Sequence, residues 1–254
     1  MDWSDDGIVL SARPHGETAA VVVLLTRAHG RHAGLVHGGQ GRKARGLYEP
    51  GNRVSATWRA RLAEHLGNFT CELLDSSVAR LLDEPARLAA LSAAAAVCDR
   101  ALPEREPHPR AYEGFLALLA ALEGDHWAEA YVAWEIALLG DLGFGLDLSA
   151  CAVEGPSAQL APNNQLAYVS PRSGRAVSLA AAEPYKDRLL ALPGFLLGRG
   201  EGGPEEVAQG LALTGHFLRK QVFDPQHQPL PPARERLSAR FPLPEVASRS
   251  SGGL

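Results

Sequence analysis

The first part of the chain alternates between short β-type runs and turns, and this alternation limits the fold more than any other feature. Apolar or alternating runs cover residues 7–10, 18–26, 31–37, 52–62 and 69–74. The run at 18–26, TAAVVVLLT, is apolar and rich in β-branched residues, which is typical of a buried strand. Glycine and proline turns separate the runs. Strands this short and this closely spaced predict a small closed barrel of the OB type.

The character of the sequence changes near Pro85. Segments rich in alanine and leucine with helical spacing follow at 86–102, 112–122, 126–142 and 205–222. Between them, two apolar runs flank a Ser-Pro-Arg-Ser-Gly turn at 170–174, which predicts a hairpin. The tail from residue 225 contains six prolines, which predicts a loose extension.

We therefore expect an α+β protein with three parts. Residues 1–78 are predicted to form an OB-type β-barrel that binds nucleic acid. Residues 79–224 are predicted to form a mainly α-helical domain with a small irregular hairpin insertion near 150–180. Residues 225–254 are predicted to be a Pro-rich, flexible tail.

Composition excludes several classes of protein. Of the 254 residues, 46% are hydrophobic and 21% are charged, which supplies a core and argues against disorder. The apolar stretches are too short to cross a bilayer, and the first residues are acidic, unlike a signal peptide. The three cysteines are widely separated, so we expect a cytoplasmic protein and no disulfide scaffold.

The net charge of −4 conceals an asymmetry along the chain. Residues 1–67 contain nine Lys/Arg against six Asp/Glu, whereas residues 68–200 contain ten against seventeen. Within residues 27–61, eight basic side chains accompany a single acid, Glu49. The segment 38–46 holds four glycines and three of these cations, which predicts a mobile basic loop. A local positive charge of this kind attracts polyanions even on an acidic protein.

Sequence motifs for catalysis are missing. The chain has no phosphate-binding Gly-Lys-Ser/Thr loop, no Gly-x-Ser-x-Gly elbow and no His-Glu-x-x-His motif. It also has no Cys-x-x-Cys pair for zinc. We therefore expect a non-enzymatic protein without cofactor or metal. A hydrolase that uses Cys151 as its nucleophile is a second, separate hypothesis.

A basic barrel suits single-stranded nucleic acid, because arginine neutralises phosphates and its guanidinium plane stacks on bases. Trp58 lies between two arginines but shares its strand face with Val54 and Ala56, which favours a core position. The alternative is a protein-binding adaptor whose barrel receives an acidic partner. The predicted DNA-binding residues are Arg13, Arg27, Arg31, Arg42, Lys43, Arg45, Arg59 and Arg61.

Two motifs resemble the bacterial RecO recombination-mediator family. The first runs from Arg13-Pro14-His15-Gly16-Glu17-Thr18 through Gly30-Arg31 to the basic loop at 38–45. The second is the sequence WEIALLGDLGFGLDL at 134–148, which leads to Cys151. The resemblance covers roughly residues 5–220. It implies an N-terminal OB barrel, a helical C-terminal domain and a role in DNA repair.

The resemblance also implies a mechanism and partners. RecO proteins bind single- and double-stranded DNA, anneal complementary strands and help a recombinase load onto strands coated by single-strand-binding protein (SSB). They do so with the partner RecR, in the RecF pathway, at the nucleoid. They receive the acidic C-terminal tail of SSB in an apolar pocket with a cation. For this pocket we expect Trp134 and Leu138, with Arg219 or Lys220 as the cation.

One departure from the family concerns zinc. Some RecO proteins carry a four-cysteine zinc site that begins at the position of Cys151. The segment 152–178 of this chain offers no further thiol. We therefore expect the hairpin to keep its shape without metal.

Overall fold

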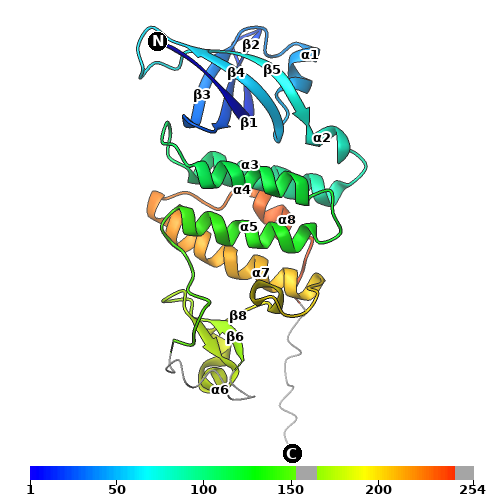
Figure 1. Ribbon diagram of the computed structural model, residues 1–254, viewed down its shortest axis with the longest axis vertical. Helices are drawn as coiled ribbons and strands as arrows, with labels where there is room; N and C mark the ends of the chain where they lie inside the picture. The colour runs from blue at the N-terminus through cyan, green and yellow to red at the C-terminus, as the bar shows by residue number, and fades with distance from the viewer. Residues whose placement is uncertain (153–164, 244–254) are drawn as a thin grey trace, which may run out of the picture.

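The computed structural model describes residues 1–152 and 165–243. The chain folds as a mixed α+β protein whose parts follow one another along a long axis (Figure 1). The strands of the N-terminal part lie at one end, a layer of helices lies in the middle, and a small sheet with α6 lies at the other end. No helix among the described residues is long and apolar enough to cross a membrane.

The N-terminal strands close into a barrel with the order β1-β2-β3-β5-β4. Their bounds are β1 Asp2–His15, β2 Ala19–Thr26, β3 Gly30–Val36, β4 Asn52–Arg59 and β5 Asn68–Ser76. The first part of β1 pairs with β4 and its second part with β2, and a bulge lies between Val9 and Ser11. A bulge bends a strand, so β1 turns from one neighbour to the other. Between β3 and β5 the closure is parallel and joins Leu35 to Asn68.

Both faces of β2 are buried, which explains its continuous apolar run. Val22 and Leu24 point into the barrel, where they pack with Trp58 and Phe69. Val23 and Leu25 alternate with them and belong to the core of the helical part. A strand covered on both faces has no position for polar side chains, since successive residues point to opposite sides. The barrel is therefore joined to the helices through a continuous apolar core.

Helix α3, Pro85–Ala101, lies next to the barrel, between it and helix α5 (Figure 1). It packs on β1 and β2 on one side and on α5 and α8 on the other. Alanines such as Ala90, Ala94 and Ala95 are buried around the helix. A helix that is apolar on every side is a core helix, and small side chains let its neighbours approach closely.

The remaining helices complete this layer. α4 and α5 pack on each other, and α5 packs on α7, which continues into a π-helical turn at Leu218–Phe223. The bounds are α2 Ser77–Arg80, α4 Pro109–Ala121, α5 Trp127–Asp141, α7 Pro204–Phe217 and α8 Pro232–Ser238. Short 3-10 turns occupy Glu183–Arg188, Gly194–Leu197 and Asp224–Gln226.

The predicted hairpin forms part of the small sheet. β6, Leu166–Val169, pairs antiparallel with β7, Ala176–Ser178, and with β8, Leu190–Ala191, in the order β7-β6-β8. Helix α6, Leu179–Ala182, follows β7 directly. The part of the insertion at residues 153–164 lies outside the described residues.

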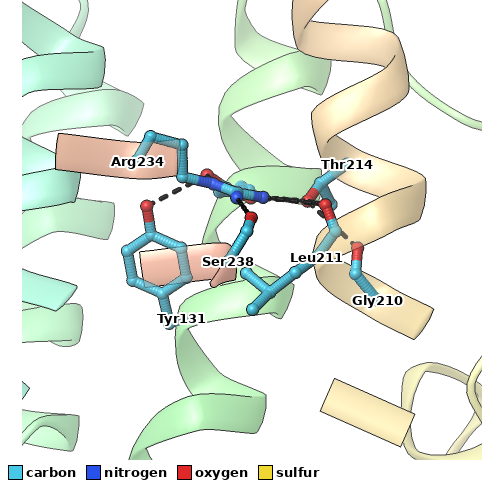
Figure 2. Close-up of polar contacts among 7 residues, drawn as sticks. Tyr131, Gly210, Leu211, Thr214, Arg234 and Ser238 are labelled. Atoms are coloured by element: carbon cyan, nitrogen blue, oxygen red, sulfur yellow. Dashed lines mark hydrogen bonds and ion pairs between the residues drawn. The ribbon is translucent and has the colours of Figure 1, made fainter. Parts of the chain in front are cut away.

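The prediction of a loose tail is wrong for residues 225–243. Helix α8 packs on α3, and Leu230 and Leu237 are buried. The side chain of Arg234 has no exposed surface and lies in a polar network with Glu135, Thr214 and Ser238 (Figure 2). Proline is favoured in the first turn of a helix, so Pro232 begins α8 and does not disrupt the helix. The rest of the predicted tail, 244–254, lies outside the described residues.

Candidate nucleic-acid interface

The glycine-rich basic segment forms a short helix where the sequence predicted a mobile loop. α1, Arg42–Leu47, lies between β3 and β4. Gly38, with a φ of +68°, makes the turn that precedes it. Arg42 and Arg45 are exposed, and no ion pair joins either of them to another described residue. The side chain of Lys43 lies outside the described part of the structure. Two of the predicted DNA-binding arginines are therefore free to meet phosphates.

The structure brings Arg45 together with Arg13. Both line a hollow of about 400 Å³ between the end of β1 and the segment that carries α1. Glu49 is the carboxylate among its lining residues. The side chain of Arg13 is 72% exposed. Residues that lie far apart in the sequence thus form one basic patch on the barrel.

Arg59 and Arg61 belong to a second basic patch, where β4 ends. Both side chains are exposed, and neither forms an ion pair within the described part of the chain. Neighbouring Trp58 is buried and its ring N–H donates to the carbonyl of Leu66 at 2.9 Å. This confirms that Trp58 is a core residue, and it fixes the loop after β4 to the barrel.

Arg105 of the helical part fixes the same loop and was missed by sequence reasoning. Its guanidinium donates to the carbonyls of Ala63 at 2.5 Å and His65 at 2.8 Å. The backbone N–H of Arg105 donates to the Arg31 carbonyl at 2.8 Å. Glu104 beside it forms a parallel bridge with Arg31 on β3. Arg105 has a left-handed backbone, with a φ of +61°. A single arginine in an acidic half of the chain gives no sequence signal for this role.

Three of the predicted DNA-binding arginines form ion pairs with acids of the helical part. Arg13 and Arg31 contact the carboxylate of Asp99 at 3.1 and 3.5 Å, respectively. The Arg31 Nε donates to the Leu102 carbonyl at 2.8 Å, and its side chain is only 20% exposed. Arg27 lies 3.1 Å from Glu113. These contacts hold the barrel on the helices, and phosphates would have to compete with them.

The structure places Trp134 and Leu138 beside a hollow of about 280 Å³ between α4 and α5. Both side chains are almost fully buried in the core, so only a small part of each side chain lines the hollow. The cation among the lining residues is Arg110, at the start of α4, and Asp141 is the acid. Gly114 and Gly140 leave room at the surface of the two helices.

The structure does not bring Arg219 or Lys220 together with Trp134 and Leu138. Neither residue lines the hollow beside Trp134. The Lys220 ammonium donates to the carbonyls of Pro171 at 2.5 Å and Arg172 at 3.2 Å, so it holds the turn of the β6–β7 hairpin. Both residues belong to the π-helical turn after α7, whereas the hollow lies between α4 and α5.

Among the described residues, Cys151 lies in a small apolar cluster of the hairpin region. Its side chain packs with Val177 and Ala182, and the Ser178 N–H donates to its sulfur at 3.3 Å. Structural zinc takes four Cys or His ligands. Within the described ranges, no three His, Cys, Asp or Glu side chains gather into a metal site. One buried thiol among apolar neighbours does not fit the four-cysteine site of some family members.

Comparison with known proteins identifies the family. The family models described as Recombination protein O N terminal and Recombination protein O C terminal match residues 1–77 and 82–229. The chain belongs to the RecO family. A DNA repair protein RecO from Rhodospirillum centenum is 61% identical over 95% of both chains. One from Rhodospirillum rubrum is 50% identical over 98% of this chain and all of the relative. The relative from Phenylobacterium zucineum is 54% identical over 92% of this chain.

The two RecO family matches divide the chain where its structure changes. The N-terminal match covers the barrel, and the C-terminal match begins just before α3. It ends at residue 229, so α8 lies beyond it although this helix completes the core.

Proposed function

We propose that this RecO-family chain is a DNA-binding and strand-annealing recombination mediator that acts in DNA repair without catalysing a reaction. The order β1-β2-β3-β5-β4, with a helix between β3 and β4, supports an OB-type barrel. Barrels of this type bind single strands in a positively charged groove.

The observation that carries this proposal is the exposure of Arg42 and Arg45 on α1 without a carboxylate partner among the described residues. Other arginines of the same basic stretch are neutralised by Asp99 and Glu113. Free guanidinium groups on a glycine-flanked helix bind phosphates of either single- or double-stranded DNA. Neutralised phosphates repel each other less, which favours the pairing of two complementary strands.

Two of the three thiols, those of Cys71 and Cys98, favour a binding role over nucleophilic catalysis. Burial raises the pKa of Cys71 to about 11, although a hydrogen bond from Tyr48 partly offsets it. Burial also raises the pKa of Cys98 well above its usual value. The thiolate is the reactive form, so these cysteines are unreactive at neutral pH.

We further propose that the hollow at Trp134 and Leu138 receives the acidic C-terminal tail of SSB, with Arg110 as the cation. The tail ends in a hydrophobic residue with a free carboxylate, as the family resemblance implies. An apolar hollow beside an exposed guanidinium suits both groups. Together with RecR, this contact would bring the protein to SSB-coated DNA at the nucleoid, where a recombinase is to be loaded.

The test is a salt titration of binding to labelled single-stranded DNA. The logarithm of the binding constant is expected to fall linearly with the logarithm of salt concentration, by about 0.7 per neutralised phosphate. Replacing Arg42 and Arg45 together by alanine is expected to flatten the slope by about 1.4. Arg188 and Arg199 are exposed arginines of the helical part, and their double replacement is the matched control. Binding without salt dependence would favour the adaptor for an acidic protein instead.

A further inference from the structure

A basic cleft lies where the barrel meets the helical part. It has a volume of about 530 Å³ and is lined from four separate segments of the chain. β1 and β3 contribute Arg13 and Arg31, and the end of α3 contributes Asp99 and Arg100. Gln226 and Gln228 contribute amides from the segment between α7 and α8. Arg100 and the two glutamines belong to none of the predicted sites.

The charges in this cleft do not balance. Three guanidinium groups face one carboxylate, that of Asp99, whose side chain is 8% exposed. The negative end of the α3 dipole offsets about half an elementary charge more. A net positive charge therefore remains in a concave site, where it attracts anions.

Two of the three arginines of the cleft donate to neutral acceptors. Arg100 donates through Nε and Nη2 to the side-chain oxygen of Gln228, at 3.2 and 3.0 Å. The Arg31 Nε donates to the Leu102 carbonyl. Neutral acceptors orient a guanidinium without cancelling its charge, so the site is prepared for an anionic ligand.

The backbone at His227 contributes to the same arrangement. His227 adopts a left-handed conformation, with a φ of +54°, between the two glutamines. This conformation is uncommon outside glycine and costs free energy. It lets the chain turn so that Gln226 and Gln228 both line the cleft.

Arg13 connects this cleft to the basic patch on the barrel. It lines the cleft with Arg100 on one side, and the hollow with Arg45 on the other. A strand that contacts Arg45 and continues past Arg13 therefore enters the junction between barrel and helices.

We infer that the DNA strand bound by the barrel continues into this cleft, where Arg100 and the amides of Gln226 and Gln228 bind a backbone phosphate. The phosphate competes with Asp99 for Arg13, which is the more exposed of the two arginines on that carboxylate. This inference rests on the proposed function, since it extends the path of the same ligand.

The experiment repeats the salt titration with two variants of opposite expected effect. Arg100→Gln keeps a polar side chain but removes the charge, and is expected to weaken binding of labelled single-stranded DNA about tenfold. It is also expected to flatten the salt slope by about 0.7. Asp99→Asn removes the competing carboxylate and is expected to tighten binding about two- to fivefold. A merely structural role for Asp99 would not produce tighter binding.

Arg188→Gln is the matched control, because Arg188 is exposed on the turn after α6. Helix α6 lies at the opposite end of the molecule from the barrel (Figure 1). Circular dichroism melting of all variants verifies the fold. If R42A/R45A flattens the slope while R100Q leaves it unchanged, the strand does not enter the junction and this inference is overturned. If the unmodified protein binds without salt dependence, the proposed function fails as well.

Discussion

Arg234 and Glu135 stand 99 residues apart in the sequence and form a two-point ion pair with no exposed side-chain surface. The Arg234 Nε lies 2.5 Å from Oε1 of Glu135, and its Nη2 lies 2.8 Å from Oε2. Tyr131 and Thr214 donate their hydroxyls to the same carboxylate. Burial alone would lower the pKa of Arg234, but the charge of Glu135 more than offsets it and the pKa is raised. The guanidinium therefore remains charged inside the helical core, and it attaches α8 to α5 and α7.

Replacing Arg234 by methionine is expected to lower the free energy of unfolding by about 3–5 kcal/mol, because Glu135 is left buried without its counter-charge. Urea unfolding measures the loss. The double variant Arg234→Met/Glu135→Leu is expected to lose less than the sum of the two single variants. Arg236→Met on the exposed side of α8 is the control, with an expected change within about 0.5 kcal/mol. Equal effects at 234 and 236 would contradict a stabilising pair.

Local composition predicted the regular elements well, because runs of β-branched residues favour strands and runs of alanine and leucine favour helices. The run at 18–26 was predicted as a strand and forms β2, and the segments at 86–102 and 126–142 form α3 and α5. Helix α8 was missed because the six prolines from residue 225 onward were interpreted as a sign of a loose extension, whereas Leu230 and Leu237 are buried and anchor this segment.

The charged partners could not be predicted, since they are distant in sequence. Arg13 and Asp99 are 86 residues apart, and Arg31 contacts a carbonyl 71 residues away. A count of charges along the chain shows a basic stretch but not which cations meet acids after folding. The same limit applies to Arg110, whose proximity to Trp134 depends on the packing of α4 against α5.

Gly30 is expected to be intolerant of any side chain. Its φ is +65°, and a Cβ built there would lie 1.9 Å from the carbonyl oxygen of Glu106. Gly30→Ala is therefore expected to destabilise the protein by about 2 kcal/mol or more, from the left-handed backbone and the clash together. Gly16 has a similar φ of +62° with no atom within 4 Å of such a Cβ, so Gly16→Ala measures the backbone cost alone. Equal losses in urea unfolding would show that the contact with Glu106 does not hold the barrel on the helical part.

His32 is expected to make stability depend on pH between about 6.5 and 4. It is buried among Trp3, Trp58 and Phe69, and neither ring nitrogen has a partner among the described residues. Burial, and then the charge of Arg105, lower its pKa from 6.5 to about 4. As pH falls, the unfolded chain therefore takes up the proton first. The stability associated with neutral His32 is complete above pH 6.5 and is lost progressively towards pH 4, by up to about 3 kcal/mol.

The variant His32→Phe removes the titration and keeps an aromatic ring in the cluster. Unfolding free energies of both proteins, measured by urea from pH 7 to pH 4, are expected to diverge, with the variant losing less stability. The difference between the two curves isolates His32 from all other groups, because those groups are present in both proteins. Parallel curves would show that His32 is not kept neutral by the fold.

The proposed pocket for the SSB tail predicts that Arg110, and not Arg219 or Lys220, determines affinity for a tail peptide. Arg110 lines the hollow with Trp134 and Leu138, whereas Lys220 is bound to hairpin carbonyls. Arg110→Glu is expected to weaken binding of a labelled acidic peptide with a hydrophobic C-terminal residue at least tenfold, since a charge-assisted contact becomes repulsive. The double reversal Arg219→Glu/Lys220→Glu is expected to leave peptide affinity unchanged. Fluorescence anisotropy measures both affinities.

The same peptide with an amidated C-terminus tests the contact with the terminal carboxylate directly. If Arg110 meets that carboxylate, the amidated peptide binds weakly to the unmodified protein and responds far less to Arg110→Glu. A full response to the reversal with the amidated peptide would instead mean that Arg110 contacts another acid of the tail.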